Sequence, residues 1–178
     1  MQVTPTDITD VKIIEPTVYE DERGLFLETF SQQRYQQQLG ITHDFVQDNF
    51  SRSKKQVLRG LHFQIDRPQG KLVQVLAGEV YDVAVDVRRH SATFGQWVGV
   101  YLSADNNKQL WIPPGFAHGF VVLSDFAHFY YKCTDYYDPQ SEQCLLWNDP
   151  AISIAWPIDT PILSAKDQQG RLLRDIFS

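Results

Sequence analysis

The sequence predicts a mainly β protein, an antiparallel sandwich or barrel of the jelly-roll kind with a few short helices. Short segments rich in Val, Tyr, Phe and Trp recur along the chain and are bounded by Gly, Pro, Asn and Asp, a pattern that indicates strands and turns. Aromatic residues make up 13% of the 178 residues, and aromatic side chains favour strands. Many short strands with frequent turns are typical of jelly rolls and related barrels. The clearest predicted strands cover residues 72–76, 79–87, 96–102, 119–123 and 127–134.

The best alternation of apolar and polar residues runs through residues 82–88. Val83, Val85 and Val87 share one face of this segment, opposite two aspartates and an arginine. Because the side chains of a strand point alternately to its two faces, we predict one buried face and one wetter face here.

Three local signals place turns and one helix. Ala77-Gly78 lies between two predicted strands and has the composition of a tight hairpin connection. The run Pro113-Pro114-Gly115 predicts a turn that leads into the next strand. One short, exposed helix is expected over residues 31–39, with Ser31 as its cap and Gly40 at its end.

Length and composition indicate a soluble protein of one domain, residues 1–178, because this length suits a single sizeable core. The net charge of −6 argues against broad attraction to nucleic acid or to anionic membranes. No secretory signal is visible at the start. Cys133 and Cys144 are the only cysteines, too few for a disulfide scaffold. We therefore expect a cytoplasmic protein with neither nucleic acid nor membrane as a partner.

The segment 57–64 carries the first candidate catalytic group, His62. Gly60 lies between this imidazole and Arg59, and a glycine inside a strand permits a bulge or the close approach of a ligand. Simple alternation would send the two side chains to opposite faces. A bulge at Gly60 would bring Arg59 and His62 to one side.

A second candidate, His118, ends a turn at residues 113–118 that leads into a predicted strand. Such a turn can present a polar group at the mouth of a barrel. His43 and His90 have no comparable setting, and we expect them on the surface. The alternation around His128 predicts that its ring faces outward or lies across a partner sheet.

A Pro-x-Gly-x-x-His turn after a strand that carries glycine and histidine resembles the cupin superfamily, whose barrel is a double-stranded β-helix. Many cupins bind a divalent metal through His-x-His and a later Glu. This sequence instead has Gln64 at the second position, and Lys71 precedes the next strand. An ammonium group opposes a cation, and two histidines are fewer than the three protein ligands typical of catalytic metal sites. We therefore expect no metal.

Further segments make the resemblance more specific. Seven blocks occur in the order seen in dTDP-4-dehydrorhamnose 3,5-epimerases, and together they extend over nearly the whole chain. The sequence therefore closely resembles that family. The blocks are residues 21–30, 47–51, 58–62, 71–73, 114–120, 131–134 and 164–167.

The resemblance implies an isomerase that needs no cofactor. Its reaction would invert C3 and C5 of dTDP-4-dehydro-6-deoxy-D-glucose and give dTDP-4-dehydro-L-rhamnose, a step of dTDP-rhamnose biosynthesis. Both carbons flank the C4 ketone, so one carbonyl acidifies both hydrogens. One base and one acid on opposite faces of the sugar can then serve two successive enolisations.

Four residues carry this chemistry in the residue-by-residue match. His62 suits the base because an imidazole titrates near neutrality, and Asp167 would hold its tautomer. Lys71 would stabilise the enolate from inside the pocket. Tyr131 would be the proton donor, and a shift in strand register would turn Tyr130 inward in its place.

The same match assigns the substrate-binding positions. Arg23, Arg59 and Lys166 are the cationic groups for the diphosphate, which arginine suits by its bidentate geometry. Tyr137 matches an aromatic residue that stacks on thymine. Because the family is homodimeric with N-terminal residues that reach the neighbouring site, Arg23 and Glu28 are expected to act across the interface. The remaining positions are Glu28, Gln47, Asp48, Asn49, His118 and Glu142.

Other functions stay open from the sequence. A relative could invert only C3 or only C5, or isomerise the ketone of a related dTDP-sugar. A non-catalytic cupin could bind the sugar nucleotide without moving a proton. A metal-dependent cupin oxygenase or isomerase is disfavoured by Gln64 and Lys71.

Overall fold

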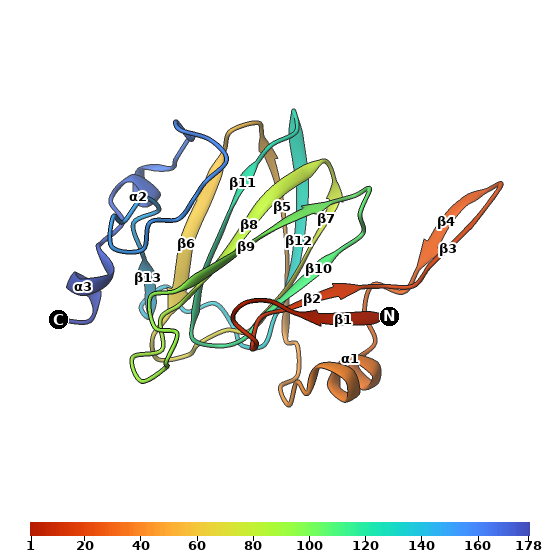
Figure 1. Cartoon of the computed structure of the whole chain (residues 1–178), viewed down its shortest axis with the longest axis horizontal. Coiled ribbons are helices and arrows are strands. Elements are labelled where there is room, and N and C mark those ends of the chain that lie inside the picture. Colours follow the sequence, from red (N-terminus) through yellow and green to blue (C-terminus); the bar gives the residue numbers. More distant parts are fainter.

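Two antiparallel β-sheets lie face to face in the computed structural model, which describes residues 1–178 (Figure 1). The six-stranded sheet has the order β1 (Gln2–Pro5), β2 (Lys12–Glu15), β10 (Gln109–Ile112), β7 (Lys71–Ala77), β12 (Phe126–Cys133) and β5 (Gln47–Lys54). The five-stranded sheet has the order β13 (Glu142–Cys144), β6 (Leu58–Gln64), β11 (Phe116–Val122), β8 (Glu79–Asp86) and β9 (Trp97–Ser103). The predicted mainly β, jelly-roll architecture is confirmed.

A separate hairpin and three short helices complete the chain. The hairpin consists of β3 (Val18–Asp21) and β4 (Gly24–Leu27) and projects away from the sandwich (Figure 1). The helices are α1 (Gln32–Leu39), α2 (Ala165–Gln168) and α3 (Leu173–Ile176). No helix in the structure combines the length and the apolar character needed to cross a bilayer.

Apolar side chains from both sheets fill the space between them. Phe129 of β12 stacks on Phe120 of β11, with ring centroids 4.0 Å apart. Val73 of β7 and Val80 of β8 belong to the same cluster and are fully buried. Burial of side chains of this size stabilises a fold by roughly 1.5–3 kcal/mol each. This layer therefore fixes the spacing of the sheets, and with it the shape of the cavity described below.

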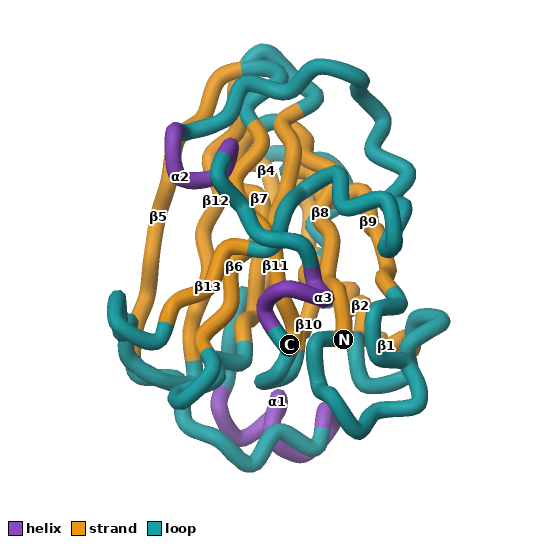
Figure 2. The backbone as a smooth tube through the Cα atoms, turned by 90° about the vertical axis from the view of Figure 1, so that its left-hand side faces the viewer, coloured by secondary structure: helices purple, strands orange, loops and turns teal.

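Part of the outer face of each sheet is covered as well. Tyr35 and Leu39 of α1 pack against Leu72 and Trp111 on the six-stranded sheet. The C-terminal segment, which includes α2 and α3, covers the five-stranded sheet. Figure 2 looks onto this segment and shows α2 at one end of the sandwich and α1 at the other. Because the chain crosses β6 on this route, a residue near the C-terminus can reach the histidine of that strand.

The five predicted strands correspond to β7, β8, β9, β11 and β12, although β11 begins at Phe116 rather than at Gly119. The predicted helix is α1. Its cap residue Ser31 makes no side-chain capping bond, whereas Gly40 ends the helix in the left-handed region at φ 70°. Glycine suits that conformation because it has no Cβ.

The hairpin predicted at Ala77-Gly78 is wrong. Gly78 does make a tight connection, with φ 79°, but β7 and β8 belong to different sheets and do not pair. The turn carries the chain from one sheet to the other. A Cβ at Gly78 would lie 2.1 Å from the carbonyl oxygen of Phe126, so the crossing requires glycine.

The wetter face predicted for residues 82–88 is also wrong. Val83 and Val85 are buried as expected, but Asp82 and Asp86 are 0% exposed too. Strand β8 lies inside the five-stranded sheet and is covered on both faces. Its carboxylates therefore need hydrogen-bond partners, which for Asp86 include the partly exposed guanidinium of Arg88.

Candidate active site

A cavity of about 330 Å³ opens between the two sheets. Strands β5, β7 and β12 line it from the six-stranded sheet, β6 and β11 line it from the five-stranded sheet, and α2 borders it. Most of the predicted catalytic and binding groups meet here. The structure brings together Asn49, Arg59, His62, Lys71, His118, Tyr131, Lys166 and Asp167.

Strand β6 has a bulge of the kind that Gly60 permits. His62 of β6 faces His118 of β11, and Arg59 faces Phe120, so β6 has one residue more than β11 between the two pairs. The backbones approach closely, since a Cβ on Gly60 would lie 2.6 Å from the Cα of Gly119. The extra residue changes the alternation of β6. As a result, Arg59 and His62 both line the cavity.

His62 and Asp167 are in direct contact, as the resemblance implied. Nε2 of His62 lies 2.6 Å from Oδ1 of Asp167, whose residue is 3% exposed. Burial alone would raise the pKa of Asp167, but the hydrogen bond and charge of His62 and the hydroxyl of Ser164 bring it below its ordinary value. An ionised carboxylate can only accept hydrogen bonds. Nε2 therefore carries the ring proton, and Nδ1 keeps a free lone pair.

Tyr131, and not Tyr130, faces the cavity. Burial, the largest of several causes, raises the pKa of Tyr131 to about 12, so its phenol is protonated at neutral pH. Tyr130 points to the opposite side of β12, where its hydroxyl donates to Asp48 at 2.8 Å. Outward orientation is also confirmed for His128, whose ring meets the exposed Phe126.

Lys71 places an ammonium group inside the protein. The residue is 8% exposed, and its Nζ lies 3.5 Å from the carbonyl oxygen of His62. Burial lowers the pKa of Lys71, and the nearby Cys133 thiol and Asp82 carboxyl oppose that shift. A cation with so little solvent around it acts strongly on charge that develops in the cavity.

A second histidine–aspartate pair lies beside Lys71, and sequence reasoning missed its acidic member. Nε2 of His118 lies 2.9 Å from Oδ2 of Asp82, and both residues are buried. Burial raises the pKa of Asp82, whereas His118 and Lys71 lower it. Its other oxygen, Oδ1, has no hydrogen-bond partner. A polar residue in the middle of an apolar strand was the only signal in the sequence.

Polar side chains extend the site along the edges of the cavity. Gln47 accepts a hydrogen bond from the backbone N–H of Tyr137 at 2.9 Å and donates to Asn49 at 3.1 Å. The Tyr137 hydroxyl donates to Glu142 at 2.8 Å, and Lys166 forms an ion pair with the same carboxylate. These contacts join three predicted binding residues, Gln47, Tyr137 and Glu142, to the cavity through Asn49 and Lys166.

Three further predicted binding residues, Asp48, Glu28 and Arg23, lie outside both the cavity and this set of contacts. Asp48 was expected to bind substrate, but the alternation of β5 puts its side chain on the outer face of the sheet. There it pairs with Lys132 at 2.8 Å. Glu28 is exposed and pairs with Arg34 at 3.2 Å. Arg23 lies in the turn region of the β3–β4 hairpin, where its side chain is 85% exposed.

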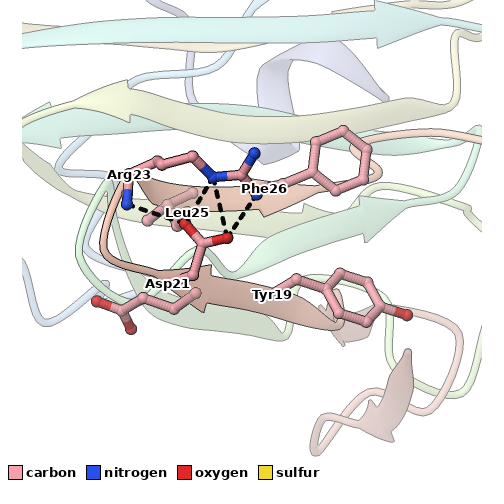
Figure 3. Close-up of a pocket in the computed structure, with 7 residues that line it drawn as sticks. Tyr19, Asp21, Arg23, Leu25 and Phe26 are labelled. Carbon is pink, nitrogen blue, oxygen red and sulfur yellow. Dashed lines mark hydrogen bonds and ion pairs between the residues drawn. The ribbon is translucent and has the colours of Figure 1, made fainter.

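The hairpin has a cleft of its own, larger than the cavity at about 490 Å³. Figure 3 shows Arg23 folded back onto Asp21, with the exposed side chains of Tyr19 and Phe26 next to each other on one side of this pair. The residues that line this cleft include no histidine and no lysine. It therefore lacks a base of suitable pKa, and the cavity between the sheets is the candidate active site.

The positions that hold a metal in many cupins do not suit a cation in this chain. Gln64 is turned into the protein, where its amide donates to the carbonyl oxygens of Arg67 and Tyr136 at 2.7 and 3.2 Å. The Lys71 ammonium lies next to His118 and His62. This donor set opposes a cation between the two histidines.

A jelly-roll sandwich whose cavity holds an oriented imidazole, a buried phenol and a buried ammonium defines a cupin-fold enzyme of the proton-transferring class. The sequence model of the dTDP-4-dehydrorhamnose 3,5-epimerases matches residues 5–175. The chain belongs to this family of isomerases. The predictions of the family and of its enzymatic class are therefore confirmed.

Individual relatives resemble the chain over almost its whole length. The dTDP-4-dehydrorhamnose 3,5-epimerase of Pseudomonas aeruginosa is 55% identical and covers 98% of this chain and 97% of its own. That of Salmonella typhimurium is 59% identical over 97% of this chain and 96% of its own. The crystal structure of a dTDP-6-deoxy-D-glucose-3,5-epimerase from Legionella pneumophila, in complex with dTDP-4-keto-L-rhamnose, superposes with a TM-score of 0.95. It is 59% identical and covers 97% of this chain and 93% of its own.

Proposed function

We propose that the protein inverts C3 and C5 of dTDP-4-dehydro-6-deoxy-D-glucose to give dTDP-4-dehydro-L-rhamnose, with no metal or cofactor. The observation that carries this proposal is the contact between His62 and the ionised Asp167, in a cavity that also holds the protonated Tyr131. The sugar nucleotide in the Legionella pneumophila relative supports the choice of substrate.

Deprotonation begins at Nδ1 of His62, the ring nitrogen with the free lone pair. It removes the hydrogen from the carbon next to the C4 ketone, and the ring becomes an imidazolium. Asp167 stabilises that cation through the 2.6 Å hydrogen bond from Nε2. The electron pair of the broken C–H bond moves into the enolate, whose oxygen is stabilised by Lys71.

Reprotonation from the opposite face completes the inversion. The Tyr131 hydroxyl donates its proton to the enolate carbon and becomes a phenolate, while the ketone re-forms. One proton then passes through solvent from the His62 imidazolium to the Tyr131 phenolate, which resets both groups. The same sequence at the second carbon gives the doubly inverted sugar.

Substrate binding follows from the groups around the cavity. Arg59 and Lys166 supply positive charge for the diphosphate in a chain whose net charge is −6. Tyr137 is 52% exposed at the edge of the site, where its ring is free to stack on thymine. The remaining contacts to the nucleotide and sugar are proposed for Gln47, Asn49, His118 and Glu142.

Arg23 and Glu28 complete the site of a second subunit in this proposal. The β3–β4 hairpin points away from the sandwich, opposite the side where β6 lies (Figure 1). Tyr19 and Phe26 on this hairpin are 63% and 69% exposed, which suits burial against a partner. A homodimer of one-domain subunits, residues 1–178, working in the cytoplasm is the assembly we propose.

Turnover in deuterated water tests the reaction. With dTDP-4-dehydro-6-deoxy-D-glucose as substrate, we expect solvent deuterium at both C3 and C5. Label at one carbon would select a mono-epimerase, a moved ketone would select an isomerase, and binding without label would select a non-catalytic module. His62→Asn should abolish exchange at both carbons and leave dTDP affinity largely intact. Full activity after chelator treatment, with no stoichiometric metal by elemental analysis, is expected for a metal-free reaction.

A further inference from the structure

A third side chain, Cys144, lies close to His62 and Asp167 on the edge strand β13. Strand β13 pairs with β6 so that Cys144 lies directly opposite His62. The thiol Sγ is 3.8 Å from Oδ1 of Asp167. One ligand atom from each of the three residues lies within 4.8 Å of the other two. None of the steps proposed above uses this thiol.

The three side chains offer the donors that zinc prefers. An imidazole nitrogen, a thiolate and a carboxylate oxygen all bind Zn²⁺, and three protein ligands with one open position form a common zinc arrangement. Zinc–ligand distances of about 2.0–2.3 Å place tetrahedral donors roughly 3.3–3.8 Å apart. The distance between Sγ and Oδ1 already agrees. The 2.6 Å contact between His62 and Asp167 has to widen, and the ligand atoms of His62 and Cys144, which lie within 4.8 Å of each other, have to reach the same spacing.

We propose that His62, Cys144 and Asp167 form an inhibitory binding site for Zn²⁺. The ion takes the place of the proton on Nε2 of His62, and that proton moves to Nδ1 through solvent. The thiol of Cys144 loses its proton to solvent as the Zn–S bond forms. With the two negative charges of the thiolate and the carboxylate, the bound ion gives a neutral cluster, which suits a site with little solvent.

Inhibition follows from the position of the ring proton. Once Nδ1 is protonated, His62 has no lone pair for the substrate and cannot act as the base. The site differs from the metal position of cupins, because the ion lies on the Asp167 side of the ring and not between His62 and His118. Loss of activity rests on the proposed role of His62, whereas binding of the ion does not.

A titration of the purified enzyme with Zn²⁺ tests the inhibition. We expect one equivalent to abolish turnover and EDTA to restore it. Cys144→Ala should require roughly tenfold or more zinc for the same fractional loss, because even residues behind a ligand contribute tenfold or more to metal affinity. Each variant is compared with its own rate without zinc. Cys133→Ala, which removes the other cysteine, is the matched control and should stay as sensitive as the natural chain.

Binding of Co²⁺ in place of Zn²⁺ gives a readout that does not depend on activity. A thiolate-to-cobalt charge-transfer band in the near ultraviolet is expected for the natural chain and for Cys133→Ala, and not for Cys144→Ala. Cys144→Ser keeps the side-chain volume and serves if the alanine variant fails to fold. Equal zinc sensitivity with and without Cys144, or a cobalt band that persists without it, would overturn the site. A cobalt band in a protein without epimerase activity would refute the proposed function alone.

Discussion

Asp167→Asn tests the central contact of the site. The substitution keeps the shape of the side chain and removes its charge, and the residue is 3% exposed, so water cannot replace that charge. Two consequences follow. The imidazolium formed during the reaction loses its counter-ion, and the new amide N–H can donate to Nε2, which would move the ring proton to the reactive Nδ1.

The size of the effect can be worked from the geometry. A hydrogen bond of 2.6 Å between Nε2 and Oδ1 places the centres of the two charges roughly 4 Å apart, which corresponds to about 4 kcal/mol at an effective dielectric constant near 20. Each 1.36 kcal/mol in the barrier changes the rate tenfold, so the charge alone contributes about a thousandfold. The misplaced ring proton lowers the rate further. In a serine protease, the same change of aspartate to asparagine beside the catalytic histidine lowers kcat by about 10⁴.

We therefore expect kcat for deuterium exchange at C3 and C5 to fall by about 10³ to 10⁴, with dTDP affinity nearly unchanged. Asp159→Asn is the matched control, because Asp159 is exposed in the same C-terminal segment. Circular dichroism and dTDP binding establish that both variants are folded. If Asp167→Asn keeps more than a tenth of the natural kcat, the carboxylate does not support His62 as we reason.

Three further changes test other parts of the structure. Tyr131→Phe should lower kcat by about 10²–10⁴ without weakening dTDP binding, and natural turnover would exclude the phenol as the acid. Gly119→Ala should lower the free energy of unfolding in urea by about 1–3 kcal/mol, because the new Cβ would lie 2.6 Å from the carbonyl oxygen of Arg59; unchanged stability would show that the bulge can relax. Burial opposes ionisation of Asp86, but hydrogen bonds from Arg88 and two hydroxyls lower its pKa to about 2. Its contribution, about 2–3 kcal/mol, is therefore present above the unfolded pKa of about 3.9 and lost as pH falls toward 2. Asp86→Asn should cost about that much at pH 7 and much less near pH 2, and a loss that does not depend on pH would contradict the assignment.

Local sequence patterns located the five clearest strands but gave no strand at β1 to β5, β10 or β13. They predicted poorly how the strands assemble. Strand identity depends on side-chain type and turn residues, which can be seen in a short window. Whether two consecutive strands pair depends on the whole fold, and Gly78 joins strands of different sheets even though its composition suits a hairpin. Burial on both faces of β8 depends in the same way on the C-terminal segment that covers it.

The site was predicted in part from local chemistry and in part from resemblance. A glycine beside two functional side chains permitted a bulge at Gly60, and strand β6 has one there. Nothing local connects His62 with Asp167, which is 105 residues further along the chain. That pairing came only from the resemblance. Asp82 and Cys144 were missed because their importance depends on which strands lie next to β11 and β6.

Asp48 is a position where local physics and the resemblance differ. Gln47, Asp48 and Asn49 were carried over together, yet they lie in one strand, and neighbouring side chains of a strand point to opposite faces of the sheet. Asn49 contacts the buried Cys133 thiol on the inner side, whereas Asp48 pairs with Lys132 on the outer side. The same alternation separates Tyr131 from Tyr130 on the partner strand. Once one residue of β5 or β12 is known to point inward, the direction of every other side chain in the two paired strands follows. Assigning Tyr131 to the cavity therefore puts Asp48 on the outer face.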